Sequence, residues 1–267
     1  MLKLKSFFKR FYLALILIFL YLPIVTLMVF SFNSGDSMAK WEGFSLKWYA
    51  EMFSNTTLME ALWVTISVAV LSSLIAVIIG TLAAIGINDY KKSTKTIVTN
   101  ITYVPMMNAD IVTGVSMLLL FIFLRIPRGY ATLLISHVAF NVPYVIFSVL
   151  PKLRTLNPNL YEAALDMGAT PFYALRKVLI PELMPGIVSG AIMAFTMSFD
   201  DFVISFFSTQ GYVNNLSTYI YSMAKVGIRP VINALCTVMF VFIITLLIIM
   251  NVRANRFAKN NKTGGTK

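Results

Sequence analysis

Long apolar runs dominate this chain and restrict what it can fold into. Each run has about 20 residues or more, the length that a helix needs to cross about 30 Å of hydrocarbon. In lipid, the backbone polar groups of such a segment must be satisfied within the helix itself. The runs lie at residues 11–32, 61–87, 97–124, 131–150, 186–208 and 231–251. The sequence therefore predicts an all-α, polytopic membrane protein with six transmembrane helices.

The composition supports the bilayer as the solvent of this chain. Hydrophobic residues make up 58% and charged residues 12% of the chain, whereas soluble domains have about 25% charged residues. The net charge of +11 lies between apolar runs and does not form the contiguous basic face typical of a nucleic-acid-binding fold. The single cysteine, Cys236, excludes an internal disulfide, and the sequence predicts no metal site and no catalytic residues.

The first apolar run could belong to a signal peptide, because Lys3, Lys5, Lys9 and Arg10 precede it. However, the run is longer than the usual 7–15 residues of a signal peptide, and no small-residue cleavage site follows it. We therefore expect an uncleaved helix. The predicted organisation is a cytoplasmic N-terminus at 1–10, a permease domain at 11–251 with a cytoplasmic loop at 151–185, and a disordered tail at 252–267.

The distribution of Lys and Arg predicts the orientation in the membrane. With the N-terminus inside, the cytoplasmic segments contain 16 of the 22 basic residues and the outer loops contain six. Basic residues are retained on the cytoplasmic side. Both termini are therefore predicted to lie in the cytoplasm.

Helix start and stop signals divide the cytoplasmic loop into two short helices. Asn157 with Pro158 forms a start signal and Gly168 a stop signal. Thr170 with Pro171 repeats the start signal, and Pro181 disfavours helical geometry at the residue before it. The sequence predicts helices over 158–167 and 171–179.

The first of these short helices contains Glu162, Ala163 and Ala164. Two small side chains allow another surface to approach the backbone closely, and the carboxylate offers a charged anchor. The same pattern also fits a helix that lies flat on the inner leaflet. From spacing alone, a docking element and a leaflet-bound helix remain open alternatives.

The spacing of the loop resembles the EAA loop of binding-protein-dependent ABC importer permeases. The matching residues are Glu162-Ala163-Ala164, Gly168-Ala169 and Val178-Leu179-Ile180-Pro181, with apolar departures at Val178 and Ile180. The resemblance implies a type I (MetI-like) permease fold, and it implies that Glu162, Ala163, Ala164, Gly168 and Ala169 couple the chain to a cytoplasmic ATPase. The chain has no Gly-rich phosphate loop of its own. We therefore expect a transport subunit and no enzyme, with ATP and Mg²⁺ bound by the partner ATPase.

Further stretches resemble the permeases of spermidine and putrescine importers, at residues 198–204, 219–222 and 227–234. This resemblance implies polyamine import across a bacterial inner membrane. The partners that it implies are a second permease (PotB-like), an ATPase dimer (PotA-like) and an extracytoplasmic binding protein (PotD-like). A permease for another small solute and a secondary cation transporter are the alternative functions.

Three acidic residues, Asp110, Asp200 and Asp201, lie within predicted membrane helices. A carboxylate at mid-membrane costs about 2.5–3.5 kcal/mol, so it normally faces a bundle interior or an aqueous path. Counted along straight helices, Asp110 and Asp200 both lie about 20 Å from the cytoplasmic end. We predict that Asp110, Asp200 and Asp201 line the path of an amine cation. The aromatic faces of Tyr219 and Tyr221 are the predicted cation–π partners.

A packing role is the alternative for these acids, above all for Asp201. Adjacent Asp200 and Asp201 are about 100° apart on a helix and do not both face one lumen. His137 is expected to be a hydrogen-bonded packing residue. Gly186 and Gly190 are expected to form a close-packing helix face.

Overall fold

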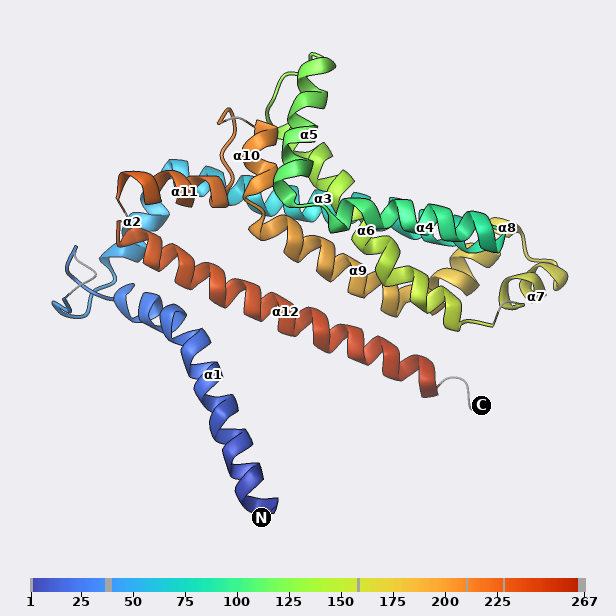
Figure 1. Cartoon of the computed structure of the whole chain (residues 1–267), viewed down its shortest axis with the longest axis horizontal. Helices are drawn as coiled ribbons and strands as arrows, with labels where there is room; N and C mark the ends of the chain where they lie inside the picture. The colour runs from blue at the N-terminus through green and yellow to red at the C-terminus, as the bar shows by residue number, and fades with distance from the viewer. Residues whose placement is uncertain (1, 37–39, 158, 210, 228, 264–267) are drawn as a thin grey trace. The chain divides into compact units, whose positions relative to one another are not determined.

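The computed structural model describes residues 2–36, 40–157, 159–209, 211–227 and 229–263, and helices joined by loops make up this part of the chain (Figure 1). The first six elements are α1 (Leu2–Phe30), α2 (Lys47–Ser54), α3 (Thr56–Asp89), α4 (Lys92–Met107), α5 (Asp110–Phe123) and α6 (Tyr130–Thr155). They are followed by α7 (Leu160–Asp166), α8 (Pro171–Ala174), the π-helix η1 (Leu175–Leu179), α9 (Ile180–Asp200), α10 (Val203–Thr209), α11 (Leu216–Val226) and α12 (Val231–Thr263).

Long apolar helices account for the membrane spans in the described residues. Five of them can cross a bilayer by length and composition: Arg10–Phe30, Thr56–Asp89, Tyr130–Thr155, Pro171–Asp200 and Val231–Ile249. The pair α4 and α5 makes a sixth span if its two parts are counted together. The all-helical, multi-pass class predicted from the apolar runs is confirmed.

The first of two compact units comprises Met1–Met59 and Ile220–Leu246. After α1, the chain turns back through an isolated antiparallel bridge between Asn33 and Phe44. The buried indole of Trp48 on α2 donates a 2.7 Å hydrogen bond from Nε1 to the carbonyl oxygen of Asn33. Phe32 stacks on Phe44, with ring centroids 5.5 Å apart. These contacts fix the short α2 to the end of α1.

The second unit comprises Glu60–Tyr219 and Leu247–Lys267, and it contains the centre of the helical packing. Here α6 and α9 lie side by side (Figure 1). A Cβ atom at Gly186 would lie 3.0 Å from the carbonyl oxygen of Ser148, and one at Gly190 would lie 3.2 Å from the Cα of Val145. The predicted close-packing face of α9 is confirmed, and α6 is the helix that it meets.

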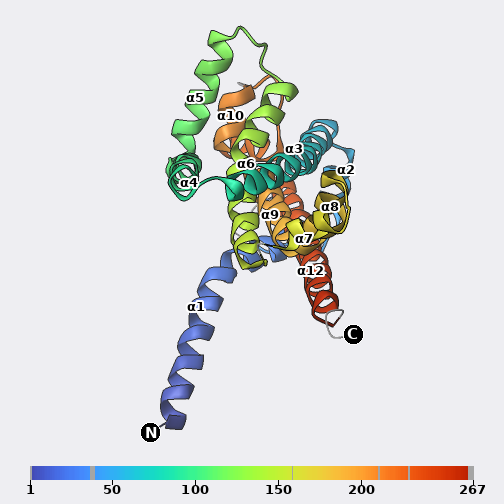
Figure 2. The same cartoon turned by 90° about the vertical axis from the view of Figure 1, so that its right-hand side faces the viewer.

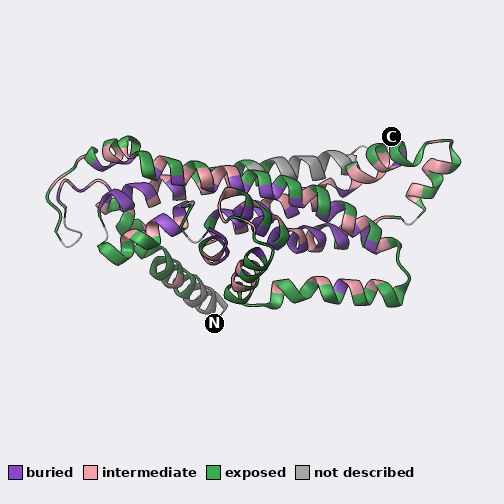
Figure 3. Ribbon diagram, turned by 90° about the horizontal axis from the view of Figure 1, so that it is seen from above, coloured by how far each residue is buried: buried purple, intermediate pink, exposed green. Residues whose placement is uncertain are grey.

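The burial of residues divides the helices into a packed set and an exposed set. In Figure 3, buried residues gather in the packed helices of the second unit, whereas the described part of α1 is largely exposed. Within the 18-residue apolar windows, 56% of the residues of α6 and none of the residues of α1 are buried in this chain. Such apolar surface is suited to contact with lipid.

Two of the predicted straight spans are broken. The run 97–124 was predicted as one helix, but α4 and α5 meet at 99°. The run 186–208 was predicted as another, but α9 ends at Asp200 and α10 begins at Val203. The second halves, α5 and α10, lie side by side in Figures 1 and 2. A Cβ atom at Gly114 of α5 would lie only 2.9 Å from the ring of Phe207 of α10, so the two helices pack closely.

Local sequence explains the first break. Pro105 inside α4 lacks an N–H and weakens the last turns of that helix. Asn108 and Ala109 then adopt extended conformations, with ψ of 147° and 138°. Asp110 begins α5, where the positive end of the helix dipole stabilises its carboxylate. Mean hydropathy does not register these backbone features, because the run stays apolar across the break.

The C-terminal end of the chain also differs from the prediction. The segment 252–267 was predicted as a disordered tail, but α12 continues to Thr263. No Gly or Pro interrupts the sequence between Val231 and Thr263, so nothing in it ends the helix earlier. Residues 264–267 of the predicted tail lie outside the described residues.

Candidate functional site

The loop at 151–185 contains the first short helix close to where the sequence predicts it. α7 spans Leu160–Asp166, and Gly168 follows it with φ of 87°, the left-handed conformation that favours glycine. The side chains of Glu162 and Ala163 are exposed, while those of Ala164 and Ala169 are half-buried. The acidic and small residues of the predicted docking helix are therefore presented on the surface of this chain.

The second short helix differs from its prediction. It begins at Pro171, capped by Thr170, whose Oγ1 accepts a 3.4 Å hydrogen bond from the backbone N–H of Tyr173. It was predicted to end before Pro181, but α8 continues through η1 into α9 without a break. In η1 the N–H of Ile180 reaches back five residues to the carbonyl of Leu175. This wider turn accommodates Pro181, which would clash with a carbonyl in a regular α-helix.

Three large apolar side chains are exposed on the same loop. Met167, Phe172 and Tyr173 are 89%, 70% and 56% exposed. Isolated apolar residues on a surface are ordinary, but a group of them beside an exposed carboxylate is typical of a protein contact. Sequence reasoning missed these residues because it considered only Glu162 and the small residues. The sequence indicates them only through their position, because they flank Thr170 and Pro171, the start signal of the second helix.

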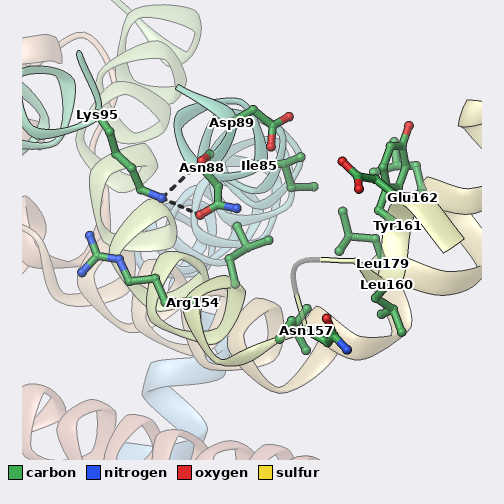
Figure 4. Close-up of a pocket in the computed structure, with 13 residues that line it drawn as sticks. Ile85, Asn88, Asp89, Lys95, Arg154, Asn157, Leu160, Tyr161, Glu162 and Leu179 are labelled. Atoms are coloured by element: carbon green, nitrogen blue, oxygen red, sulfur yellow. Dashed lines mark hydrogen bonds between the residues drawn. The ribbon is translucent and has the colours of Figure 1, made fainter. Parts of the chain in front are cut away.

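A cavity of about 550 Å³ lies between α7 and the ends of α3 and α6 (Figure 4). The carboxylates of Glu162 and Asp89 point into it from opposite sides. Lys95 donates a 2.6 Å hydrogen bond from Nζ to Oδ1 of Asn88, which fixes the start of α4 to the end of α3. Glu162 thus shares a cavity with residues on both sides of the loop between α3 and α4, a relation that the spacing in the sequence did not indicate.

Two of the predicted pathway acids lie at the helix breaks. Asp110 is the first residue of α5, and Asp200 is the last residue of α9. Both are exposed in this chain. The 99° bend means that counting 1.5 Å per residue along a straight helix does not give the depth of Asp110, so that part of the depth argument is wrong. What the two acids share is their place at an interruption of a membrane helix.

Asp201 has a different setting from Asp200. Its side chain is only 7% exposed. Oδ2 accepts hydrogen bonds from the backbone N–H of Ser205 at 2.7 Å and from its hydroxyl at 2.8 Å, and Oδ1 accepts one from the N–H of Ile204 at 3.2 Å. Nε2 of His137 lies 3.5 Å from Oδ2. Asp201 therefore caps the first turn of α10 and does not face an open space.

The two candidate tyrosines differ in environment. Tyr219 is 6% exposed, whereas Tyr221 is 40% exposed. The ammonium of Lys225 lies 4.6 Å from the centroid of the Tyr221 ring, so a cation–π contact within the chain already occupies this face. Two residues apart on a helix, the tyrosines point in directions that differ by about 160°. They do not form one aromatic surface.

Interrupted membrane helices with charged groups at their ends are typical of the substrate sites of membrane transporters. The chain belongs to the family described as the binding-protein-dependent transport system inner membrane component, whose model matches residues 76–260. It is 39% identical over 249 residues to the spermidine/putrescine transport system permease protein PotC of Escherichia coli K12, covering 93% of this chain and 94% of that protein. It is 35% identical over 227 residues to the putrescine transport system permease protein PotI of the same strain, covering 82% and 80%.

Solved structures show the same fold. A crystal structure of a bacterial ABC transporter involved in the import of the acidic polysaccharide alginate contains a chain with a TM-score of 0.67 and 19% identity, covering 95% of this chain and 99% of that chain. As a member of the family, the protein is a multi-pass permease subunit of an ABC importer. Such an importer also has a partner permease, a binding protein and a separate ATPase subunit that hydrolyses ATP.

Proposed function

We propose that this permease imports polyamines, with spermidine and putrescine as substrates. The observation that carries the proposal is the similarity along nearly the whole chain to PotC, a spermidine/putrescine permease by name. The exposed carboxylates of Asp110 and Asp200 at helix breaks agree with a cationic substrate. Fixed carboxylates offset the hydration that an ammonium loses in a narrow path, far more than they would at a screened surface.

We infer that the coupling to ATP hydrolysis passes through α7 and the turn that follows it. The exposed carboxylate of Glu162 would serve as the ionic contact, and Ala163 and Ala164 would allow close approach. The positive φ of Gly168 would set the direction of α7 relative to the chain that follows it, which begins with Ala169. The exposed Phe172 extends this surface with apolar area that the chain itself leaves uncovered.

The assembly that fits this function has four kinds of subunit. This chain would pair with a PotB-like permease, a PotA-like ATPase dimer and a PotD-like extracytoplasmic binding protein. ATP and Mg²⁺ would be bound by the ATPase, because this sequence has no phosphate loop. The excess of Lys and Arg in alternate loops supports cytoplasmic termini and a cytoplasmic position for the coupling loop.

The substrate class is tested by ATPase stimulation. The affinity-tagged chain is co-expressed with its neighbouring transport genes, purified with the subunits that stay bound, and placed in proteoliposomes. The binding protein is then added after loading with spermidine, putrescine, a neutral sugar or an acidic amino acid. Stimulation by the two polyamine-loaded forms alone is expected. Stimulation by the sugar-loaded or amino-acid-loaded form would identify an importer for another small solute.

A further inference from the structure

A buried histidine connects the two halves of the broken fifth span. His137 on α6 is 1% exposed. Its Nδ1 lies 2.5 Å from Oγ of Ser198, near the end of α9, and its Nε2 lies 3.0 Å from Oγ of Ser205, in the first turn of α10. One imidazole therefore contacts both sides of the break at Asp201 and Phe202.

The partners determine which nitrogen of His137 carries the proton. The hydroxyl of Ser205 donates to Oδ2 of Asp201 at 2.8 Å, so Oγ of Ser205 is an acceptor toward the histidine. Nε2 of a neutral His137 must then donate, and Nδ1 accepts from the hydroxyl of Ser198. The hydrogen bonds thus run in one direction, from Ser198 through His137 and Ser205 to the carboxylate of Asp201.

Further polar side chains extend this row on both sides. The hydroxyl of Ser72 on α3 lies 3.1 Å from that of Ser198. Nδ2 of Asn215 donates to Oγ of Ser205 at 2.8 Å and to the carbonyl oxygen of Asp201 at 3.2 Å. The break residue Asp201 is therefore held through both its carboxylate and its carbonyl. An apolar residue at 137 would break the link between Ser198 and Ser205, although Ser198 would keep its contact with Ser72, and Ser205 would keep Asp201 and Asn215.

We propose that His137 is a positioning residue of the transport pathway, beyond the packing role expected from the sequence. It fixes the interruption between α9 and α10 and, through it, the exposed orientation of Asp200. With Asp201 held in the cap of α10, Asp200 is left as the carboxylate of this pair that is available to a substrate. The proposal rests on the proposed function in one respect, namely that Asp200 lines the path of the amine.

Two amide substitutions test the two ring nitrogens of His137 separately. The amide of His137→Gln reaches the place of Nε2 and keeps a donor for Ser205, whereas that of His137→Asn reaches the place of Nδ1 and keeps a contact only with Ser198. We expect His137→Gln to retain the KM for spermidine within about twofold. We expect His137→Asn and Ser205→Ala each to raise this KM about tenfold, and the double variant His137→Asn with Ser205→Ala to show little further increase.

The matched control is Ser136→Ala. The hydroxyl of Ser208 donates to Oγ of Ser136 at 2.8 Å, so this variant also removes a buried hydrogen bond between α6 and α10 but leaves Asp201 untouched. Its KM is expected to stay within about twofold of the unmodified value at matched membrane abundance. Equal KM values for His137→Gln and His137→Asn, or an equal rise for Ser136→Ala, would overturn the positioning role.

A labelling experiment tests the same break without substrate. In a Cys236→Ala chain, Asp200→Cys provides one thiol at the end of α9, and its rate of reaction with a positively charged thiosulfonate reports its exposure. We expect His137→Asn to slow this reaction about tenfold and His137→Gln to leave it unchanged. Unchanged rates in both variants would refute the proposal. Suppose that Asp200→Asn transported polyamines normally while labelling behaved as expected. Asp200 would then not line the substrate path, but the role of His137 in positioning the break between α9 and α10 would be supported.

Discussion

Replacing Asp200 by Asn removes one negative charge at the end of α9 while it keeps the size and polarity of the side chain. Asp200 is exposed and lies at a helix break, and Asp201 beside it is occupied in capping α10. We therefore expect the substitution to weaken the passage of a polyamine with little effect on folding. Asp201→Asn should instead lower the amount of folded protein, because it replaces one of the two oxygens that accept buried hydrogen bonds with an amide donor.

The size of the effect follows from the exposure of the carboxylate. Two unit charges 4 Å apart interact by about 1 kcal/mol in bulk water and by about 4 kcal/mol at an effective dielectric constant of 20. Asp200 has access to water in this chain, so the lower part of this range applies. The partial negative charge at the C-terminus of α9 also stays in place. A loss of about 1 to 2 kcal/mol corresponds to a five- to thirty-fold increase in KM.

The assay is uptake of labelled spermidine, putrescine and a monovalent amine by the Asp200→Asn importer at matched membrane abundance. The increase in KM should be largest for spermidine and smallest for the monovalent amine, because more positive charges feel the lost carboxylate. Glu60→Gln likewise changes an exposed carboxylate to an amide, in α3 and outside the cavity that contains Glu162, and its KM should not change. Unchanged KM values in Asp200→Asn for all three amines would refute the reasoning.

The other predictions concern the coupling loop and the helix packing. Glu162→Lys should abolish uptake without loss of the chain from the membrane, and normal uptake with the ATPase bound would disprove the docking role. Phe172→Ser removes a 70% exposed apolar side chain whose burial would contribute about 1.5–3 kcal/mol, so ATPase affinity measured by titration should fall at least about tenfold. Gly190→Val would place side-chain atoms against α6 and cost about 1–3 kcal/mol, seen as a lower Tm in detergent. Gly86→Ala, with nothing within 4 Å of its Cβ position, should leave that Tm unchanged, and an equal loss there would contradict the packing argument.

The spans and the docking helix could be predicted because their signals are local. The hydrocarbon core sets the length of an apolar run, and the start and stop residues of α7 act within one turn. The glycines of α9 likewise indicated a close helix contact before its partner, α6, was known. The sequence could not supply that partner, because nothing in the pattern of α9 distinguishes one apolar neighbour from another.

The helix breaks escaped prediction for a physical reason. Hydropathy sums side chains over a window, whereas a break depends on backbone angles at one or two residues. Asn108 before Asp110 and Asp201 before Ser205 carry cap-like signals, but hydropathy places both residues inside continuous apolar runs. The role of His137 depends on Ser198 and Ser205, which are 61 and 68 residues away in sequence. Only the folded chain brings these side chains together.

The central claim is that this chain is one of two permease subunits of an ATP-driven polyamine importer and that Glu162 couples it to the ATPase. The most direct test is uptake of labelled spermidine into proteoliposomes that contain the purified assembly and loaded binding protein, with ATP or a non-hydrolysable analogue on the cytoplasmic face. We expect uptake with ATP, none with the analogue, and none with ATP in the Glu162→Lys assembly. Spermidine uptake that proceeds equally with the analogue, or that is unaffected by Glu162→Lys, would contradict the claim.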